Sequence, residues 1–254
     1  MKIVISPAKT LNFVSELPTS KFTKPLFLKE AKVIHGVLKQ KSPVELCNLM
    51  DISPKLAELN WQRNQRRNYI TSKIKETARQ AIYTFNGEVY IGLDALTIPI
   101  DKIDILQNRL RILSGLYGML KPLDLIEAYR LEMGTHITVG DKENLYGFWK
   151  DSITKALNRD LKKGELFVNL ASKEYFNVID SKKLKVPVIT PEFKDYSGGQ
   201  LKMVSFFAKK ARGMMVRYII DTNAETLDDL KGFNYEGYAF DGKLSAGNNL
   251  VFTR

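Results

Sequence analysis

The amino-acid sequence predicts an α+β fold, a single globular domain over residues 1–254 in which helices surround a mixed β-sheet. The composition is that of a chain with a hydrophobic core, because 44% of the residues are hydrophobic and 26% are charged. Helical and strand-like segments intermix without a regular βαβ period. No repeat, low-complexity tract or clear linker divides the chain. These observations together favour one domain with a mixed sheet.

The first third of the chain predicts one buried strand followed by helices. Ile3-Val4-Ile5 is a short apolar run that Ser6-Pro7 ends, which is typical of a buried strand and the loop after it. Prolines stand near the expected helix starts, and Ser53-Pro54 restarts a helix. Helices are expected at about residues 25–39, 43–60, 61–69 and 73–85, the third of them polar and basic enough to face solvent or phosphate.

The rest of the chain predicts both strands and helices. Asn86-Gly87 forms a turn into a short apolar stretch. A helix through Leu110 and Leu113 is expected after Asp101, and a further helical piece after Lys121-Pro122. The remaining elements are strands at 167–170, 186–190 and 202–206, a strong helix at about 207–221, and a hairpin of 235–240 with 250–252.

The chain carries a formal net charge of +11, and the excess is uneven. Residues 1–80 contain 15 basic and 6 acidic side chains, whereas residues 196–220 contain five cations and no acid. A positive potential concentrates polyanions, of which nucleic acid is the commonest. The alternative for any single basic stretch is an ordinary solvated face.

Composition also disfavours several classes of protein. No window approaches the ~20 apolar residues of a transmembrane helix, and the N-terminal apolar run is too short for a signal peptide. We therefore expect a cytoplasmic protein without a membrane partner. Cys47 has no second cysteine to pair with, and His35 and His136 are far apart in the sequence. Gly134 weakens the helix that would bring Glu132 and His136 together. We expect neither a metal nor a cofactor, and we favour a monomer.

Leu113-Ser114-Gly115-Leu116-Tyr117-Gly118 lies between two expected helices and suggests a helix-hairpin-helix. In that motif two glycines let the backbone approach a DNA phosphate, which meets main-chain N–H groups at a helix N-terminus. The usual motif has its second glycine two positions after the first, whereas here the separation is three, and a plain helix cap is the alternative. The predicted DNA contacts are Ser114, Gly115, Tyr117 and Gly118, together with Arg111, Lys121 and Arg130.

The expected helix at 207–221 has an apolar stripe and a basic side. Lys209, Lys210 and Arg212 lie opposite the stripe, where they face either solvent or phosphates. Gly213 costs about 1 kcal/mol in a helix relative to alanine, which suggests that another group approaches closely there.

The loop after the first strand contains Ser6 and Lys9. A Ser-x-x-Lys pair occurs in acylating serine enzymes, but Pro7 and the preceding strand are the wrong context for one. Lys9 is instead a candidate phosphate contact or Schiff-base nucleophile, and a loop lysine held by packing is the alternative. Glu132 and Glu174 stand near the ends of apolar stretches and are candidate general acids or bases.

Seven motifs in order resemble the peroxide stress resistance protein YaaA family of bacteria, and the resemblance covers nearly the whole chain. They are Ile5–Leu11, Leu113–Gly118, Pro122–Asp124, Tyr129–Gly134, Asn169–Ser172, Ala208–Gly213 and Gly232–Tyr238. The resemblance implies a cytoplasmic protein that limits peroxide damage to DNA and protein, apparently by lowering free intracellular iron. It also implies a positively charged cleft, a helix-hairpin-helix variant at Leu113–Gly118 and affinity for double-stranded DNA, including distorted DNA.

The leading hypothesis is therefore a DNA-binding protein of the peroxide stress response. Its cleft is expected to contain Lys9, Lys209, Lys210 and Arg212, with the hairpin anchoring a phosphate. Ser6 is a further predicted DNA contact. The competing hypothesis is an enzyme that processes a nucleotide or a flipped base. Lys9 or Lys209 is then the nucleophile, and Glu132 or Glu174 the acid or base.

Overall fold

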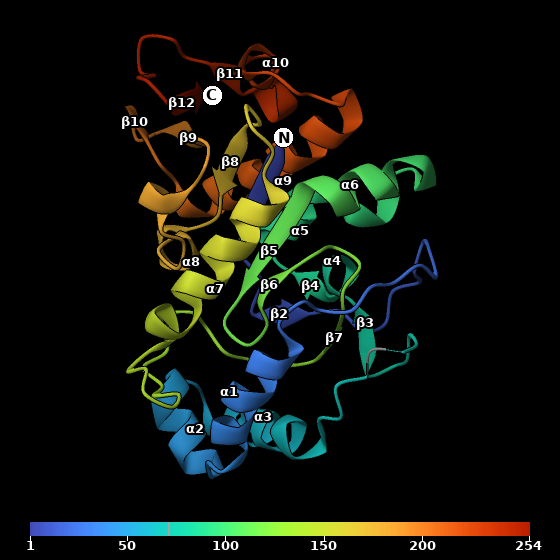
Figure 1. The fold of residues 1–254 in the computed structure, drawn as a ribbon. Coiled ribbons are helices and arrows are strands. Elements are labelled where there is room, and N and C mark those ends of the chain that lie inside the picture. The colour runs from blue at the N-terminus through green and yellow to red at the C-terminus, as the bar shows by residue number, and fades with distance from the viewer. Residues whose placement is uncertain (71) are drawn as a thin grey trace.

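A mixed eight-stranded sheet forms the centre of the computed structural model, which describes residues 1–70 and 72–254 (Figure 1). The strand order is β11-β12-β9-β8-β1-β5-β6, and β10 pairs with β9. The strands are β1 (Lys2–Ile5), β5 (Leu110–Ser114), β6 (Gly118–Leu120), β8 (Phe167–Leu170), β9 (Val188–Ser197), β10 (Gln200–Lys202), β11 (Ala239–Phe240) and β12 (Asn249–Thr253). Neighbours from β12 through β5 are parallel, and the outer pairs are antiparallel. The predicted α+β class with a mixed sheet is confirmed.

Both faces of the short central strand β1 are buried. Ile3, Val4 and Ile5 have no exposed surface, and they pair in parallel with β5 on one side and β8 on the other. Parallel strands covered on both faces are continuous apolar runs, as Ile3-Val4-Ile5 is. Two small sheets flank the main one: β2 (Thr10–Leu11) pairs with β4 (Phe85–Asn86), and β3 (Ala78–Gln80) with β7 (Leu125–Glu127).

Helices surround the sheet, and α1 to α3 lie at the end of the molecule opposite to β9 through β12 (Figure 1). Ser42 and Ser53 cap α2 and α3, each followed by a proline in the first turn. The helices are α1 (Leu28–Lys39), α2 (Pro43–Met50), α3 (Pro54–Arg66), α4 (Ala81–Thr84), α5 (Glu88–Leu93), α6 (Ile103–Arg109), α7 (Leu145–Asp160), α8 (Lys173–Phe176), α9 (Ser205–Thr222) and α10 (Leu227–Lys231). None of the helices in the described ranges is long and apolar enough to span a bilayer.

Three expected helical segments have a different structure. The segment 73–85 forms β3, α4 and β4, and the piece after Lys121-Pro122 forms β7. The helix expected to reach Leu113 ends at Arg109, where β5 begins. In each case strand pairing with a distant segment satisfies the backbone N–H and C=O groups, and this outweighs the local helical pattern. The expected strands at 167–170 and 186–190 and the long helix α9 are confirmed. The C-terminal hairpin forms between β11 and β12, but residues 235–237 of its expected first strand form a 3-10 turn. The strand expected at 202–206 is wrong, because β10 ends at Lys202 and α9 begins at Ser205.

The predicted helix-hairpin-helix at Leu113–Gly118 is a β-hairpin between β5 and β6. Ser114 pairs with Gly118 across the turn, and the Ser114 hydroxyl accepts a hydrogen bond from the Tyr117 N–H at 2.9 Å. Gly118 has a φ of +68°, and a Cβ there would lie 2.8 Å from the Trp149 ring. The glycine is therefore required by a left-handed turn under a tryptophan, and the turn is buried beneath it.

Helices α5 and α9 cross in close contact through two glycines. A Cβ on Gly213 would overlap the carbonyl oxygen of Val89, and a Cβ on Gly92 would overlap the carbonyl oxygen of Lys210. The close approach expected at Gly213 is thus made by another helix of the same chain. The glycines let the two backbones touch directly, which fixes the position of α9 relative to α5.

Substitution of Gly213 by alanine tests this crossing. We expect Gly213→Ala to lower the free energy of unfolding by about 1–3 kcal/mol, because the added methyl group overpacks the interface. Gly36 is a matched control on the exposed face of α1, where nothing lies within 4 Å of an added Cβ. Gly36→Ala is expected to raise stability by about 0.4–1 kcal/mol. Urea unfolding followed by circular dichroism measures both, and a Gly213→Ala variant as stable as the parent would contradict the packing described.

Candidate functional site

A cavity of about 340 Å³ lies at the carboxyl ends of β1 and β8. In the main sheet the strand after β1 is β5, on one side of it, and the strand after β8 is β9, on the other side. The strand order therefore reverses between β1 and β8, and crevices at such points are the usual ligand sites of open α/β sheets. Ser6 follows β1 and Ser172 follows β8, so parallel pairing brings the two residues together across this crevice.

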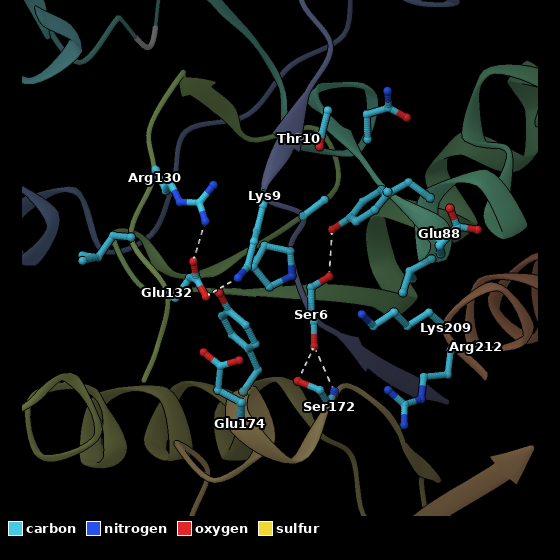
Figure 2. A pocket seen from close by; sticks show the side chains of 18 of the residues that line it. Ser6, Lys9, Thr10, Glu88, Arg130, Glu132, Ser172, Glu174, Lys209 and Arg212 are labelled. Atoms are coloured by element: carbon cyan, nitrogen blue, oxygen red, sulfur yellow. Dashed lines mark hydrogen bonds and ion pairs between the residues drawn. The ribbon is translucent and has the colours of Figure 1, made fainter. Parts of the chain in front are cut away.

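Hydrogen bonds fix the two serines. The Ser172 N–H donates to the Ser6 hydroxyl oxygen at 2.9 Å, and the Ser6 hydroxyl donates to the Ser172 hydroxyl at 3.2 Å. The Tyr90 hydroxyl donates to the Ser6 carbonyl oxygen at 3.0 Å, which ties α5 to the loop after β1. Ser6 and Ser172 lie between the two sides of the cavity in Figure 2.

The cavity wall contains four cations and three carboxylates, drawn from five separate segments. The four predicted catalytic candidates all line it. The cations are Lys9, Arg130, Lys209 and Arg212, and the carboxylates are Glu88, Glu132 and Glu174. The cavity is thus rich in ionisable groups of both signs. Its four cations exceed its three carboxylates by one charge, whereas the sequence predicted a cleft lined by cations.

Glu132 holds two of the cations on one side of the cavity (Figure 2). Its carboxylate lies 2.7 Å from the Lys9 ammonium and 3.0 Å from the Arg130 guanidinium. Glu174 accepts a hydrogen bond from the Gly134 N–H at 3.1 Å, so its carboxylate is oriented by the backbone. This side therefore offers carboxylate oxygens and an ammonium group in fixed positions, which can bind a ligand that carries donors or exchange a proton with it.

Lys209 and Arg212, which we call the α9 cations, extend from α9 toward Ser6 and Ser172 on the other side (Figure 2). Neither forms an ion pair with a carboxylate of the described residues. Burial lowers the pKa of the Arg212 guanidinium, although arginine stays protonated at neutral pH. The α9 cations therefore make this side of the cavity an anion-attracting surface.

Three buried tyrosines form the floor of the cavity. Tyr90, Tyr129 and Tyr175 are each 7% exposed. Burial raises the pKa of all three phenols well above the ordinary value. The hydroxyl of Tyr129 is also hydrogen-bonded to the Ser114 hydroxyl at 2.7 Å. The phenols thus remain neutral hydrogen-bonding groups at physiological pH.

The structure divides the predicted DNA contacts into three groups. Ser6, Lys9, Arg130, Lys209 and Arg212 line the cavity. Lys121 is exposed but lies on a second cavity of about 370 Å³, and the Lys210 ammonium pairs with Glu236 at 2.5 Å outside the first one. The third group is buried: Arg111, Ser114, Gly115, Tyr117 and Gly118. Of these, Arg111 borders the second cavity although it is only 1% exposed.

The burial of the third group was not expected from the sequence, and it has packing reasons. Arg111 is 1% exposed and forms an ion pair with Asp160. Ser114 and Tyr117 belong to the covered β5–β6 turn and form hydrogen bonds within it.

Two residues of the cavity were not predicted from the sequence, Tyr90 and Glu88. They reach the cavity because α5 packs on α9. The turn at Asn86-Gly87 was the only local signal near them.

The fold and the cavity define an α+β protein with a mixed sheet and a cavity of ionisable side chains at the carboxyl ends of parallel strands. The chain belongs to the peroxide stress protein YaaA family, whose sequence pattern it matches over residues 1–244. A UPF0246 protein of Flavobacterium johnsoniae is 70% identical over 254 residues, and one of Flavobacterium psychrophilum is 65% identical, each alignment covering 100% of both chains. A UPF0246 protein of Hahella chejuensis is 46% identical, covering 100% of this chain and 99% of its own. The family resemblance of the seven motifs is confirmed.

The raised tyrosine pKa values predict a loss of stability in alkali. A folded-state pKa above the unfolded value of about 10 means that the folded state keeps its protons longer, so its stability falls as the pH rises past 10. Tyrosinate absorbance should therefore be lower for the folded protein at pH 10–11 than for the same protein in guanidinium. The absorbance of folded Tyr129→Phe should equal that of the parent in this range, and a loss of one tyrosinate would contradict the raised pKa of Tyr129.

Proposed function

We propose that this protein binds DNA and protects it during peroxide stress, with the α9 cations as the principal phosphate contact. The observation that carries the proposal is the position of Lys209 and Arg212, which face a cavity at a strand-end crevice without an ion pair in the described part of the chain. Charge-assisted hydrogen bonds from such cations to phosphate are among the strongest that proteins make.

The overall charge and the family support this proposal. The net charge of +11 would bring a polyanion to the surface, and the family is described by its role in peroxide stress. The bound DNA on this proposal is double-stranded or distorted, and the protein acts in the cytoplasm as a monomer. The described residues contain no group of three or more His, Cys, Asp or Glu that could hold a metal ion. We therefore propose that any lowering of free iron is indirect.

The salt dependence of DNA binding tests the phosphate contact. Neutralisation of about five phosphates gives a slope of log K against log salt near −4.5, because each phosphate releases about 0.9 counterions. We expect Lys209→Gln with Arg212→Gln to reduce the steepness by about 1.8. Fluorescence anisotropy with a duplex and a bubble oligonucleotide measures the slope.

Lys182→Gln provides the matched control, because Lys182 is exposed and does not line the cavity. This variant loses one charge on the surface and should keep the slope of the parent protein within about one unit. Absence of binding to either DNA at low salt, or an unchanged slope in the double variant, would remove the proposal.

A second candidate function is favoured by the geometry of Lys9 and Glu132. The 2.7 Å pair lies in the same cavity as Lys209 and Glu174, so both predicted nucleophiles and both predicted acids or bases surround one space. An amine and a carboxylate in that arrangement suit a lyase that acts on a damaged nucleotide: the amine attacks the sugar aldehyde at C1′, water leaves, and the carboxylate moves the proton. Such an enzyme would use the same DNA-binding surface.

Reductive trapping distinguishes the enzyme from a binding protein. If the lyase hypothesis holds, borohydride added to the protein with duplex DNA that contains an abasic site should produce a covalent adduct, which runs as a shifted band on a denaturing gel. Lys9→Ala or Lys209→Ala, whichever removes the nucleophile, should abolish the adduct, and Lys182→Ala should leave it in place. No adduct with the parent protein would rule out a Schiff-base mechanism while leaving DNA binding intact.

A further inference from the structure

The two sides of the cavity differ in how their charges are satisfied. On one side Glu132 is paired with Lys9 and Arg130. On the other side the α9 cations have no carboxylate within ion-pairing distance in the described chain, although Glu88 lines the same cavity. The positive charge of the cavity is therefore concentrated at one end of it (Figure 2).

Helix geometry places the α9 cations side by side. Lys209 and Arg212 are three residues apart in α9, a spacing that puts side chains on one face about 5–6 Å apart at Cβ. Gly213 prevents this face from moving away, because its contact with Val89 fixes the helix against α5. Arg212 is partly buried without an ion pair in the described chain, whereas Lys209 is exposed. Burial of an unpaired cation is costly, and an anion bound between Arg212 and Lys209 would offset that cost.

Hydroxyl donors complete this end of the cavity. The Ser6 hydroxyl donates a hydrogen bond to the Ser172 hydroxyl oxygen. The hydroxyl proton of Ser172 can therefore be donated to another acceptor. Among the described contacts that proton has no acceptor. The α9 cations approach from the opposite direction in Figure 2, so an anion placed between them and Ser172 receives donors from both sides.

We propose that this end of the cavity binds a phosphomonoester, the terminal phosphate of a nucleotide. A phosphomonoester carries a charge of about −1.5 to −2 at pH 7, which matches two cations, whereas an internal diester carries only one negative charge. Lys209 supplies a point charge and Arg212 a planar fork of donors, a combination suited to phosphate oxygens.

The remaining cavity indicates what the phosphate is attached to. A volume of 340 Å³ is at the lower end of the range of small-molecule sites, about 300–1,000 Å³, so it leaves room for one sugar or nucleoside unit beyond the phosphate. The far side presents the carboxylates of Glu132 and Glu174, whose oxygens can accept further hydrogen bonds from hydroxyl or amino donors on the ligand. A nucleotide with a terminal phosphate meets both requirements, whether it is a free nucleotide or the end of a DNA strand.

Four ligands separate these sources. They are deoxythymidine monophosphate, deoxythymidine, a blunt duplex with terminal phosphates and the same duplex without them. The inference rests on the proposed DNA binding only for its strand-end source, and the unphosphorylated duplex measures that binding independently. Calorimetry for the small ligands and anisotropy for the duplexes give the dissociation constants.

The expected result is a phosphate-dependent affinity that requires the α9 cations. At least one phosphorylated ligand should bind about tenfold more tightly than its unphosphorylated counterpart, as expected for a charge-assisted contact. Arg212→Gln should abolish this difference, and Lys182→Gln should retain it. Thermal unfolding shows whether Arg212→Gln is folded, and Lys209→Gln supplies a second variant if it is not.

The result that overturns the inference is equally specific. Equal binding of each phosphorylated ligand and its unphosphorylated counterpart removes it, even if the bare duplex binds well and the proposed function stands. Conversely, phosphate-dependent binding of deoxythymidine monophosphate with no binding to either duplex supports the free-nucleotide source and removes DNA binding.

Discussion

The close crossing of α5 and α9 is the contact on which the geometry of the site depends. Gly92 and Gly213 let the two backbones touch, and no side chain stands between them that could adjust its rotamer. One face of α5 supplies Tyr90, which holds the loop after β1 through the Ser6 carbonyl. The facing side of α9 supplies Arg212. A single helix contact thus sets the distance between the anion-attracting end of the cavity and the strand ends.

The sheet supplies the other half of the positioning. Parallel pairing of β1 with β8 forces the chain to leave both strands at the same edge, so Ser6 and Ser172 meet although 166 positions separate them. The hydrogen bonds between these serines satisfy polar groups that would otherwise be buried without partners at the end of the sheet. A cavity at this edge follows from the topology, and the charged residues of the loops determine what it attracts.

The sequence predicted residues of the cavity best where a lysine lies on, or directly after, an element with a clear apolar pattern. Lys9 and Lys209 could be identified because each follows or lies on an element with a clear apolar signal, and the cavity contains both. Gly118 was misleading because a turn between strands and a turn between helices can both require a left-handed residue. Gly115 has no left-handed backbone and is required by its close approach to the Leu131 carbonyl. Two tertiary contacts distinguish the strand turn from the helix turn. They are the pairing of β5 with β6 and the contact of the Trp149 ring with Gly118.

The basic stretch before Asp221 shows why charge along a sequence overstates charge at a site. No acid lies within the stretch, yet Lys210 pairs with Glu236, 26 positions later, and Arg217 pairs with Asp221 one helical turn beyond it. Acids outside the stretch therefore neutralise part of its charge. Lys202, Lys209 and Arg212 remain without an ion pair among the described residues. Of these three, Lys209 and Arg212 line the cavity, where Arg212 is partly buried and Lys209 is exposed. Because the effective dielectric constant around partly buried Arg212 is lower than at the surface, this guanidinium interacts with an anion more strongly than a fully solvated lysine would. Selectivity in this protein therefore depends on where the charge lies more than on its total.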